Sequence, residues 1–331
     1  MKKLYSILIF LFSFYYFFAF DDIEQPYSLL LGNVRRKIFY KAMGDIPYKR
    51  NLNLLQMGKA MEKAKYSFSL NDAESAFLVY DWVISNIKVD FQDNDKYIET
   101  VYHTGKGNPD GVSSLFIFLC NFLKIKSKPI SGLIKIGNVS KIENFISYKK
   151  STWNYIVINN TYYLIDATLG SGVFNDRDYS YYYGHVNFAT KPEIFINSHF
   201  PYDSKWQLLP QPFTIKKFTS RPFVSDCFYE FGYESFSPDN IEINGSGEIK
   251  LALTYTELNF CDDIYASTIN VYSNLSYKYE VDTKINELKG KKEIILNKNN
   301  KKPLILKIGC VHKARSVGPT HLLMAYKLNP D

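Results

Sequence analysis

The chain has 331 residues, of which 46% are hydrophobic and 22% charged, a composition typical of globular domains and unlike that of disordered or collagen-like chains. At roughly 100–200 residues per domain, this length predicts two domains. The net charge of +7 comes from basic residues spread along the chain. No clustered basic face is expected, which argues against nucleic acid as a partner.

The N-terminus predicts a secretory signal peptide over residues 1–20. The basic pair Lys2-Lys3 precedes Leu4–Phe20, a stretch of 17 almost wholly apolar residues, and Ala19 offers a small residue for cleavage. We therefore expect a protein that is secreted or held in the secretory pathway. An uncleaved membrane anchor is the alternative, because such a run reaches the lower limit of the about 17–25 residues that cross a bilayer. Membrane contact is expected only in that case.

Four Asn-x-Ser/Thr sequons become informative if the chain is secreted. In a eukaryotic secretory pathway they can carry glycans, which predicts a glycoprotein, although an Asn-rich chain also forms such triplets by chance. The sequons begin at Asn138, Asn159, Asn244 and Asn274.

Four cysteines allow three disulfide pairings. Cys227, Cys261 and Cys310 lie in the last third of the chain, which predicts one disulfide there and leaves Cys120 as a candidate free thiol. Neither Cys-x-x-Cys nor paired histidine spacing occurs. The sequence therefore predicts no zinc or other metal site, and no cofactor is expected.

The sequence predicts helices in the first part of the mature chain. Residues 21–63 predict a helical or mixed segment, and 71–87 predict a helix with Asn71 or Asp72 as its cap and an apolar stripe on one face. A loop rich in Gly and Pro is expected over about 90–110. Residues 113–123 then predict a second helix, which we expect to be buried because it lacks a polar face.

Strands follow from about residue 128. Lys128–Ile136, Trp153–Ile158 and Tyr162–Asp166 have strand patterns, and Asn159-Asn160 between the last two is a hairpin turn signal. A short helix is expected near Pro192–Asn197. Helices followed by antiparallel strands predict an α+β layout.

The C-terminal part predicts a β-sandwich over residues 213–331. About seven short alternating runs occur over about 110 residues, separated by Gly, Asn and Lys turns. These runs are Ile241–Ile243, Glu248–Thr256, Ser267–Tyr272, Tyr277–Val281, Glu293–Leu296, Leu304–Ile308 and His321–Tyr326.

The middle of the chain resembles the transglutaminase-like superfamily, and within it the kyphoscoliosis-peptidase-like subgroup. The order and spacing of its motifs support this resemblance over residues 64–212. The motifs are Asp81-Trp82-Val83-Ile84-Ser85-Asn86-Ile87, Gly111-x-x-x-Leu115-Phe116-x-x-Leu119-Cys120, Ile130-Ser131-Gly132, Trp153-Asn154, Tyr163-Leu164-Ile165-Asp166-Ala167-Thr168, Phe188-x-Thr190-x-Pro192-Glu193, His199-Phe200-Pro201 and Trp206-Gln207-Leu208-Leu209. The resemblance implies a papain/transglutaminase-like core followed by a β-sandwich domain.

The family works through a Cys, His and Asp triad. The thiolate sits at a helix N-terminus, the imidazole transfers the proton, and the carboxylate orients the imidazole. By the resemblance, the Cys position is Pro109 and the His position is Ser151, and only Asp166 is retained. We expect no intact catalytic site, and we expect Asp166 to be a hydrogen-bonded structural residue at a strand end.

Several residues are candidate substitutes for the missing groups. Ser113 and Ser114 lie one turn inside the helix, and His103 lies near the preceding loop. His185 and His199 fall in family-like segments away from the triad positions, and Cys120 lies deep in an apolar helix, where a thiol normally packs.

Three functional hypotheses follow. The first is a secreted pseudoenzyme that binds a protein or peptide partner. The second is an active cysteine-type peptidase or protein-glutamine acyltransferase with a displaced site. The third is an extracellular structural scaffold, suggested by the tyrosine run Tyr179–Tyr183.

Overall fold

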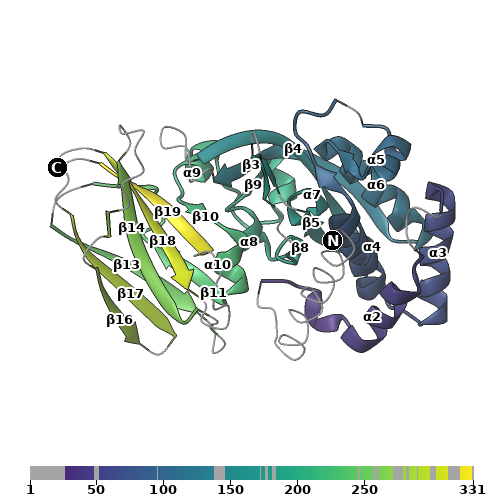
Figure 1. Cartoon of the computed structure of the whole chain (residues 1–331), viewed down its shortest axis with the longest axis horizontal. Coiled ribbons are helices and arrows are strands. Elements are labelled where there is room, and N and C mark those ends of the chain that lie inside the picture. The colour runs from purple at the N-terminus through teal and green to yellow at the C-terminus, as the bar shows by residue number, and fades with distance from the viewer. Residues whose placement is uncertain are drawn as a thin grey trace, which may run out of the picture.

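The computed structural model shows an α+β part and a β-sandwich lying side by side along the long axis of the molecule (Figure 1). It describes residues 27–47, 52–94, 96–137, 146–171, 173–175, 178–180, 184–244, 247–255, 259, 261–270, 279–280, 283–288, 290–298, 303–311 and 321–329. The predicted signal peptide, the sequons at Asn138 and Asn274 and part of the run Tyr179–Tyr183 lie outside these residues. The limits of the four predicted segments stay predictions.

Three helices come first in the described part of the chain, and two of them begin with a capping box. After the 3₁₀ turn η1 (Leu31–Asn33) come α2 (Arg36–Asp45), α3 (Leu54–Ser67) and α4 (Asp72–Asn86). Asn53 caps α3 with Gln56, and Asn71 caps α4 with Glu74. Each cap satisfies backbone N–H groups that the first turn of a helix leaves unpaired. The predicted helix over 71–87 and its Asn71 cap are confirmed.

The second predicted helix starts earlier than expected. After α5 (Ile98–Thr104), helix α6 runs over Pro109–Phe122, not 113–123, because Asn108 caps it and accepts a hydrogen bond from Gly111 N. Proline at the first helical position costs no hydrogen bond there. The short strands β1 (Lys88–Val89) and β2 (Lys106–Gly107) pair in parallel beside α5. The expectation that α6 is buried is confirmed for Leu115, Phe116 and Leu119.

A five-stranded antiparallel sheet forms the centre of the α+β part, in the order β8-β5-β4-β3-β9. Its strands are β3 (Lys126–Gly137), β4 (Ile146–Ile158), β5 (Thr161–Ile165), β8 (Phe188–Thr190) and β9 (His199–Pro201). The predicted hairpin is confirmed: Asn159 and Asn160 have φ of 49° and 62°, as a two-residue type I′ turn requires. The predicted short helix is α8 (Pro192–Phe195).

The two faces of this sheet are covered differently. Helix α6 packs on one face, where Asn154 Nδ2 donates to Ser113 Oγ at 2.9 Å. On the opposite face, Trp153 and Phe195 lie in a second apolar cluster with Tyr155 and Trp206, whose rings stack at 4.4 Å. Successive side chains of β4 therefore point alternately to the helix and to this second cluster.

The C-terminal part is a sandwich of two sheets that share one apolar core. The first has the order β10-β19-β18-β14-β15, with β12 also paired to β19, and the second has the order β11-β13-β17-β16. The strands are β10 (Phe223–Val224), β11 (Tyr233–Ser237), β12 (Glu242–Ile243), β13 (Gly247–Tyr255), β14 (Asp263–Asn270), β15 (Tyr279–Glu280), β16 (Thr283–Leu288), β17 (Lys291–Lys298), β18 (Leu304–Val311) and β19 (His321–Leu328). All seven predicted runs overlap strands, whereas β10, β11 and β16 were not predicted.

Elements at the junction and beside the sheet complete the fold. Helices α9 (Ile215–Thr219) and α10 (Asp226–Glu230) connect the two parts. The short helix α7 (Ala167–Gly170), the 3₁₀ turn η3 (Ser204–Gln207) and the small hairpin of β6 (Val173–Asn175) and β7 (Asp178–Ser180) belong to the α+β part. One continuous apolar core includes residues of both parts.

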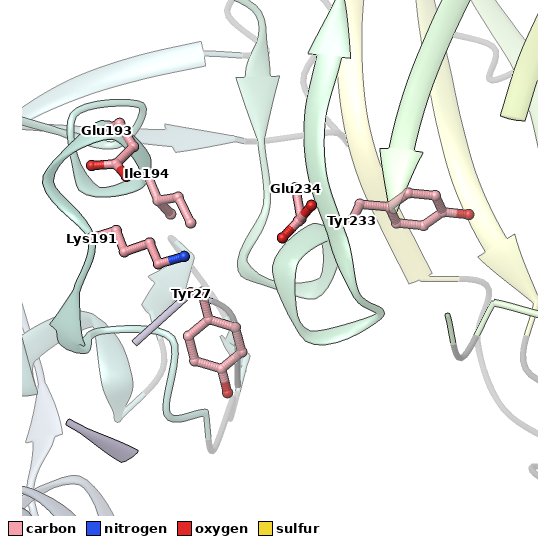
Figure 2. A pocket seen from close by; sticks show the side chains of 6 residues that line it. All are labelled: Tyr27, Lys191, Glu193, Ile194, Tyr233 and Glu234. Carbon is pink, nitrogen blue, oxygen red and sulfur yellow. The ribbon is translucent and has the colours of Figure 1, made fainter. Parts of the chain in front are cut away.

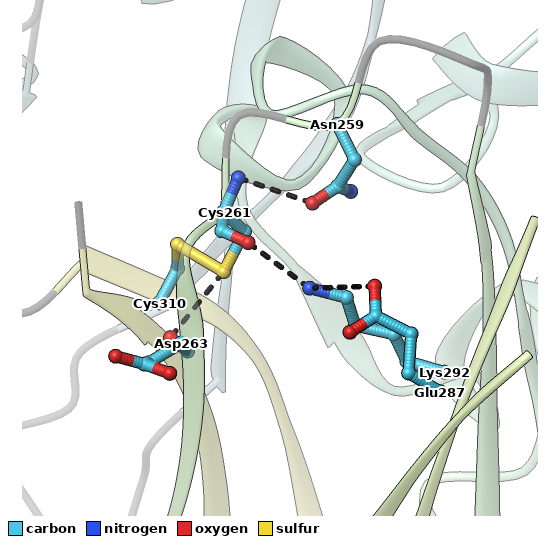
Figure 3. The surroundings of a disulfide bond; sticks show 6 residues. All are labelled: Asn259, Cys261, Asp263, Glu287, Lys292 and Cys310. Carbon is cyan, nitrogen blue, oxygen red and sulfur yellow. Dashed lines mark hydrogen bonds and ion pairs between the residues drawn. A yellow bond between two sulfur atoms is a disulfide. The ribbon is translucent and has the colours of Figure 1, made fainter. Parts of the chain in front are cut away.

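The predicted disulfide in the last third of the chain is confirmed as Cys261–Cys310 (Figure 3). It joins Cys261, two residues before β14, to Cys310, the last but one residue of β18, within the sandwich. Lys292 on β17 donates a hydrogen bond to Cys261 O at 3.0 Å, which ties the second sheet to the same point. Cys120 and Cys227 are not part of this bond. Among the described residues, no helix combines the length and apolarity needed to cross a bilayer.

Candidate functional site

The start of α6 is fixed to the central sheet but presents no nucleophile. Pro109 is the first helical residue, directly after the capping residue Asn108. The next residue, Asp110, accepts a hydrogen bond of 2.5 Å from Thr152 Oγ1 on β4. The partial positive charge at such a helix start would favour a thiolate, but a proline ring has no group that it could ionise.

Ser151 does not point to the start of α6. Its neighbours on β4, Thr152 and Asn154, both reach α6 with their side chains. Alternation along the strand places Ser151 on the other face, with Trp153. Ser151 Oγ and Trp153 Nε1 are both buried, and neither has a hydrogen-bond partner among the described residues. Among the described residues, Ser151 thus makes no side-chain hydrogen bond to the start of α6.

Asp166 pairs with His199 instead. His199 Nε2 lies 2.9 Å from Asp166 Oδ2, and both side chains are 0% exposed. The other carboxylate oxygen, Oδ1, accepts hydrogen bonds from Thr168 N at 2.6 Å and Leu169 N at 3.2 Å, so Asp166 also caps α7. Asp166 is hydrogen-bonded at the end of β5 as expected, and its purely structural role stays a prediction. The pairing with His199 was not predicted. The two residues lie 33 positions apart in the sequence. They meet through the order of the sheet, in which β3 lies between β4 and β9.

The imidazole of His199 is enclosed on every described side. Its ring stacks on Phe195 with centroids 3.7 Å apart, and the edge of Trp153 meets it at 5.0 Å. Its second nitrogen, Nδ1, lies 2.8 Å from Ser198 Oγ. This hydrogen-bonded order of hydroxyl, imidazole and carboxylate is the one used in serine hydrolases. Because the imidazole has no exposed surface, the geometry favours a structural role.

A second carboxylate from the sandwich side lies close to this pair. Asp226 on α10 accepts a hydrogen bond of 2.7 Å from Asn187 Nδ2, and Asn187 O accepts one from Asp166 N at 2.9 Å. Burial raises the pKa of Asp226 to about 6, against the opposing influence of His199 and the Asn187 hydrogen bond. Asp166, Asn187, His199 and Asp226 thus form one polar cluster, named here the junction cluster, inside the apolar junction.

The substitutes considered from the sequence do not assemble a site. Ser113 Oγ is occupied by Asn154, and the exposed Ser114 points to solvent. His103 is exposed on α5, and His185 Nε2 lies 3.3 Å from Asp81 Oδ1 on α4. Cys120 is buried in the apolar core, as expected, and this burial raises the pKa of its thiol. Among the described residues, no group of three or more His, Cys, Asp or Glu is arranged to hold a metal ion.

Residues 60–167 match the model of the transglutaminase-like superfamily. This chain contains a transglutaminase-like domain. The match includes Pro109, Ser151 and Asp166 and ends before His199. Kyphoscoliosis peptidase from Homo sapiens is 26% identical over 191 residues, covering 54% of this chain and 29% of that protein. The kyphoscoliosis-peptidase-like subgroup inferred from the motifs is thereby supported.

Two further relatives align over similar lengths. Lim and transglutaminase domain protein ltd-1 from Caenorhabditis elegans is 27% identical over 188 residues, covering 52% of this chain and 26% of that protein. Hillarin from Drosophila melanogaster is 23% identical over 217 residues, covering 60% of this chain and 25% of that protein. The chain therefore matches less than a third of the length of each of these relatives.

Proposed function

We propose that this transglutaminase-like protein performs no acyl-transfer chemistry and acts by binding a protein or peptide partner. One observation supports this above all others. Pro109 occupies the first position of α6, where a nucleophile would gain from the helix dipole. Asp166, the one retained triad residue, is held by His199 on one oxygen and by backbone amides on the other. A fold that keeps its core without its nucleophile is suited to recognition.

The compartment is part of the same proposal. The Cys261–Cys310 disulfide suits an oxidising environment, which agrees with the predicted signal peptide. Two sequon asparagines, Asn159 and Asn244, are exposed and open to glycosylation. We propose that the protein is secreted and glycosylated. A mass measurement of the secreted protein before and after glycosidase treatment tests both points, and an unglycosylated protein retained in membranes would contradict them.

A thiol-reactivity assay tests the absence of catalysis. The purified protein is treated with an iodoacetamide probe and assayed for peptide hydrolysis and for amine incorporation into glutamine. We expect no fast labelling and no turnover, because the Cys120 thiol is buried, Cys227 on α10 is half-buried, and neither cysteine stands at the start of α6. The variant Pro109→Cys is the positive control: a thiol at the start of α6 should label faster than any native cysteine. Fast labelling of a native cysteine, together with turnover that the probe abolishes, would establish the displaced-site enzyme instead.

A further inference from the structure

A pocket lies at the junction of the two parts, away from the triad positions (Figure 2). It is lined by residues of three segments: Tyr27 from the N-terminal segment; Lys191, Glu193 and Ile194 at the start of α8; and Tyr233 and Glu234 at the start of β11. It contains about 390 Å³ of empty space, part of which opens to solvent. Sites of this kind between domains commonly bind ligands.

Opposite charges face each other across this pocket. In Figure 2 the Lys191 ammonium points into the pocket from α8, and the Glu234 carboxylate points toward it from β11. Within the described residues, neither side chain takes part in an ion pair or a side-chain hydrogen bond. Ile194 also points into the space, the buried Tyr27 lines it with its ring directed away from Lys191, and the ring of Tyr233 points away into the sandwich.

These charges restrict the chemistry of the ligand. A purely anionic ligand would be repelled by Glu234, and a purely cationic one by Lys191. An uncharged ligand would cover both groups without pairing them, which is costly for charged side chains. A ligand that carries one acidic and one basic group satisfies both. In an extended peptide, side chains two positions apart point the same way and lie about 7 Å apart.

We propose that this pocket binds an extended peptide segment in which an acidic residue pairs with Lys191 and a basic residue two positions away pairs with Glu234. The proposal rests on the proposed function, since it gives the partner-binding activity a place and a ligand chemistry. Ile194 and Tyr27 contact the apolar part of the segment between the two charges. The triad positions take no part in this binding.

Four blocked pentapeptides test the proposal by fluorescence polarisation with the full mature chain. Their central residues are Glu-Ala-Lys, Glu-Ala-Gln, Gln-Ala-Lys and Gln-Ala-Gln, each flanked by glycines. We expect Glu-Ala-Lys to bind tightest. Lys191→Met should weaken only the two Glu-containing peptides, and Glu234→Gln only the two Lys-containing peptides, each by about fivefold, as expected for one partly exposed ion pair.

The control is Glu99→Gln, which removes an exposed carboxylate on α5 that does not line the pocket. This variant should bind all four peptides as the parent does. Absence of saturable Glu-Ala-Lys binding, or an equal loss for all peptides in both variants, would overturn the pocket assignment. Failure of the proposed function is a separate result, because thiol-dependent turnover is measured without these peptides.

Discussion

Asp166 uses both of its carboxylate oxygens in hydrogen bonds inside the protein. Oδ1 caps α7 through two backbone amides, and Oδ2 pairs with His199. A buried carboxylate without a partner is costly, so loss of the imidazole would leave half of this network uncompensated. Both contacts of the aspartate thus contribute to the structure, whatever its part in chemistry.

Replacement of His199 by Phe should destabilise the α+β part by about 3 kcal/mol, because Asp166 Oδ2 then stays buried and unpaired. Unfolding in urea, followed by tryptophan fluorescence, measures this effect selectively, since Trp82, Trp153 and Trp206 all lie in that part. Ser198→Ala is the control and should cost less than about 1 kcal/mol, because the half-buried hydroxyl makes one short hydrogen bond, to His199 Nδ1, and one long one of 3.4 Å to Phe195 O. Equal effects of the two substitutions would contradict this account of the pair.

Asp226 should make the folded junction more stable at acidic pH than at neutral pH. Burial raises its pKa from an ordinary value near 4 to about 6. The folded state thus binds this proton more tightly than the unfolded state, so the stabilisation is full below pH 4 and is lost as pH rises through 6. The free energy of unfolding of Asp226→Asn, relative to that of the parent, should therefore rise by about 2 kcal/mol between pH 4 and pH 7.5.

Urea titrations of the parent and of Asp226→Asn at a series of pH values measure that difference. The exposed Asp45 at the end of α2 supplies the control, and Asp45→Asn should show no such trend. A difference between parent and Asp226→Asn that stays constant from pH 4 to 7.5 would show that this carboxylate does not titrate in the junction.

At the scale of elements, local signals in the sequence predicted much of the fold. Asn71 before an apolar stripe predicts α4 and its cap, and Asn159-Asn160 predicts the β4–β5 hairpin. The start of α6 also has a local sequence signal, the capping residue Asn108 followed by a proline. The glycines around this signal nevertheless favoured a loop. The pairing of Asp166 with His199 has no local signal, because it depends on the placement of β9 beside β3. Side-chain direction on β4 likewise depends on which face α6 covers.

Lys135 on β3 holds helix α9 against the sheet. Its ammonium donates to Phe218 O at 2.9 Å and to Arg221 O at 3.1 Å, and it lies over the Phe218 ring. Burial, with a smaller contribution from Arg221, lowers the Lys135 pKa to about 7. The neutral amine is therefore favoured in the folded state, and its stabilisation is lost as pH falls from above 10 through 7.

Between pH 7 and pH 9, the free energy of unfolding of the parent should therefore rise by about 2 kcal/mol relative to that of Lys135→Met. Denaturant midpoints at these two pH values, read by tryptophan fluorescence, provide the measurement. Lys128→Met is the matched control on the same strand, where the side chain is exposed, and it should leave the pH dependence of the parent unchanged. A parent and a Lys135→Met variant with parallel pH profiles would mean that this amine stays charged.

At the scale of the whole molecule, the two parts are coupled through shared interior. Their apolar core is continuous, Asp226 reaches from the sandwich into the junction cluster, and Lys135 reaches from the sheet to α9. A change in the stability of the sandwich should therefore also change the stability of the α+β part. The Cys261–Cys310 disulfide offers a test, because it lies wholly in the sandwich and closes a loop with a sequence separation of 49 residues.

Removal of this disulfide in the double variant Cys261→Ala and Cys310→Ala should lower the free energy of unfolding by about 3–4 kcal/mol, the cost of a freed loop of that length in the unfolded chain. Calorimetry reports the loss for the whole protein, and tryptophan fluorescence reports it for the α+β part. Because the core is continuous, we expect both transitions to move down together. Dithiothreitol should destabilise the parent to a similar degree and leave the double variant unchanged. A tryptophan transition that stays in place while the calorimetric one falls would show that the two parts unfold independently, and that the junction contacts add little to the stability of either.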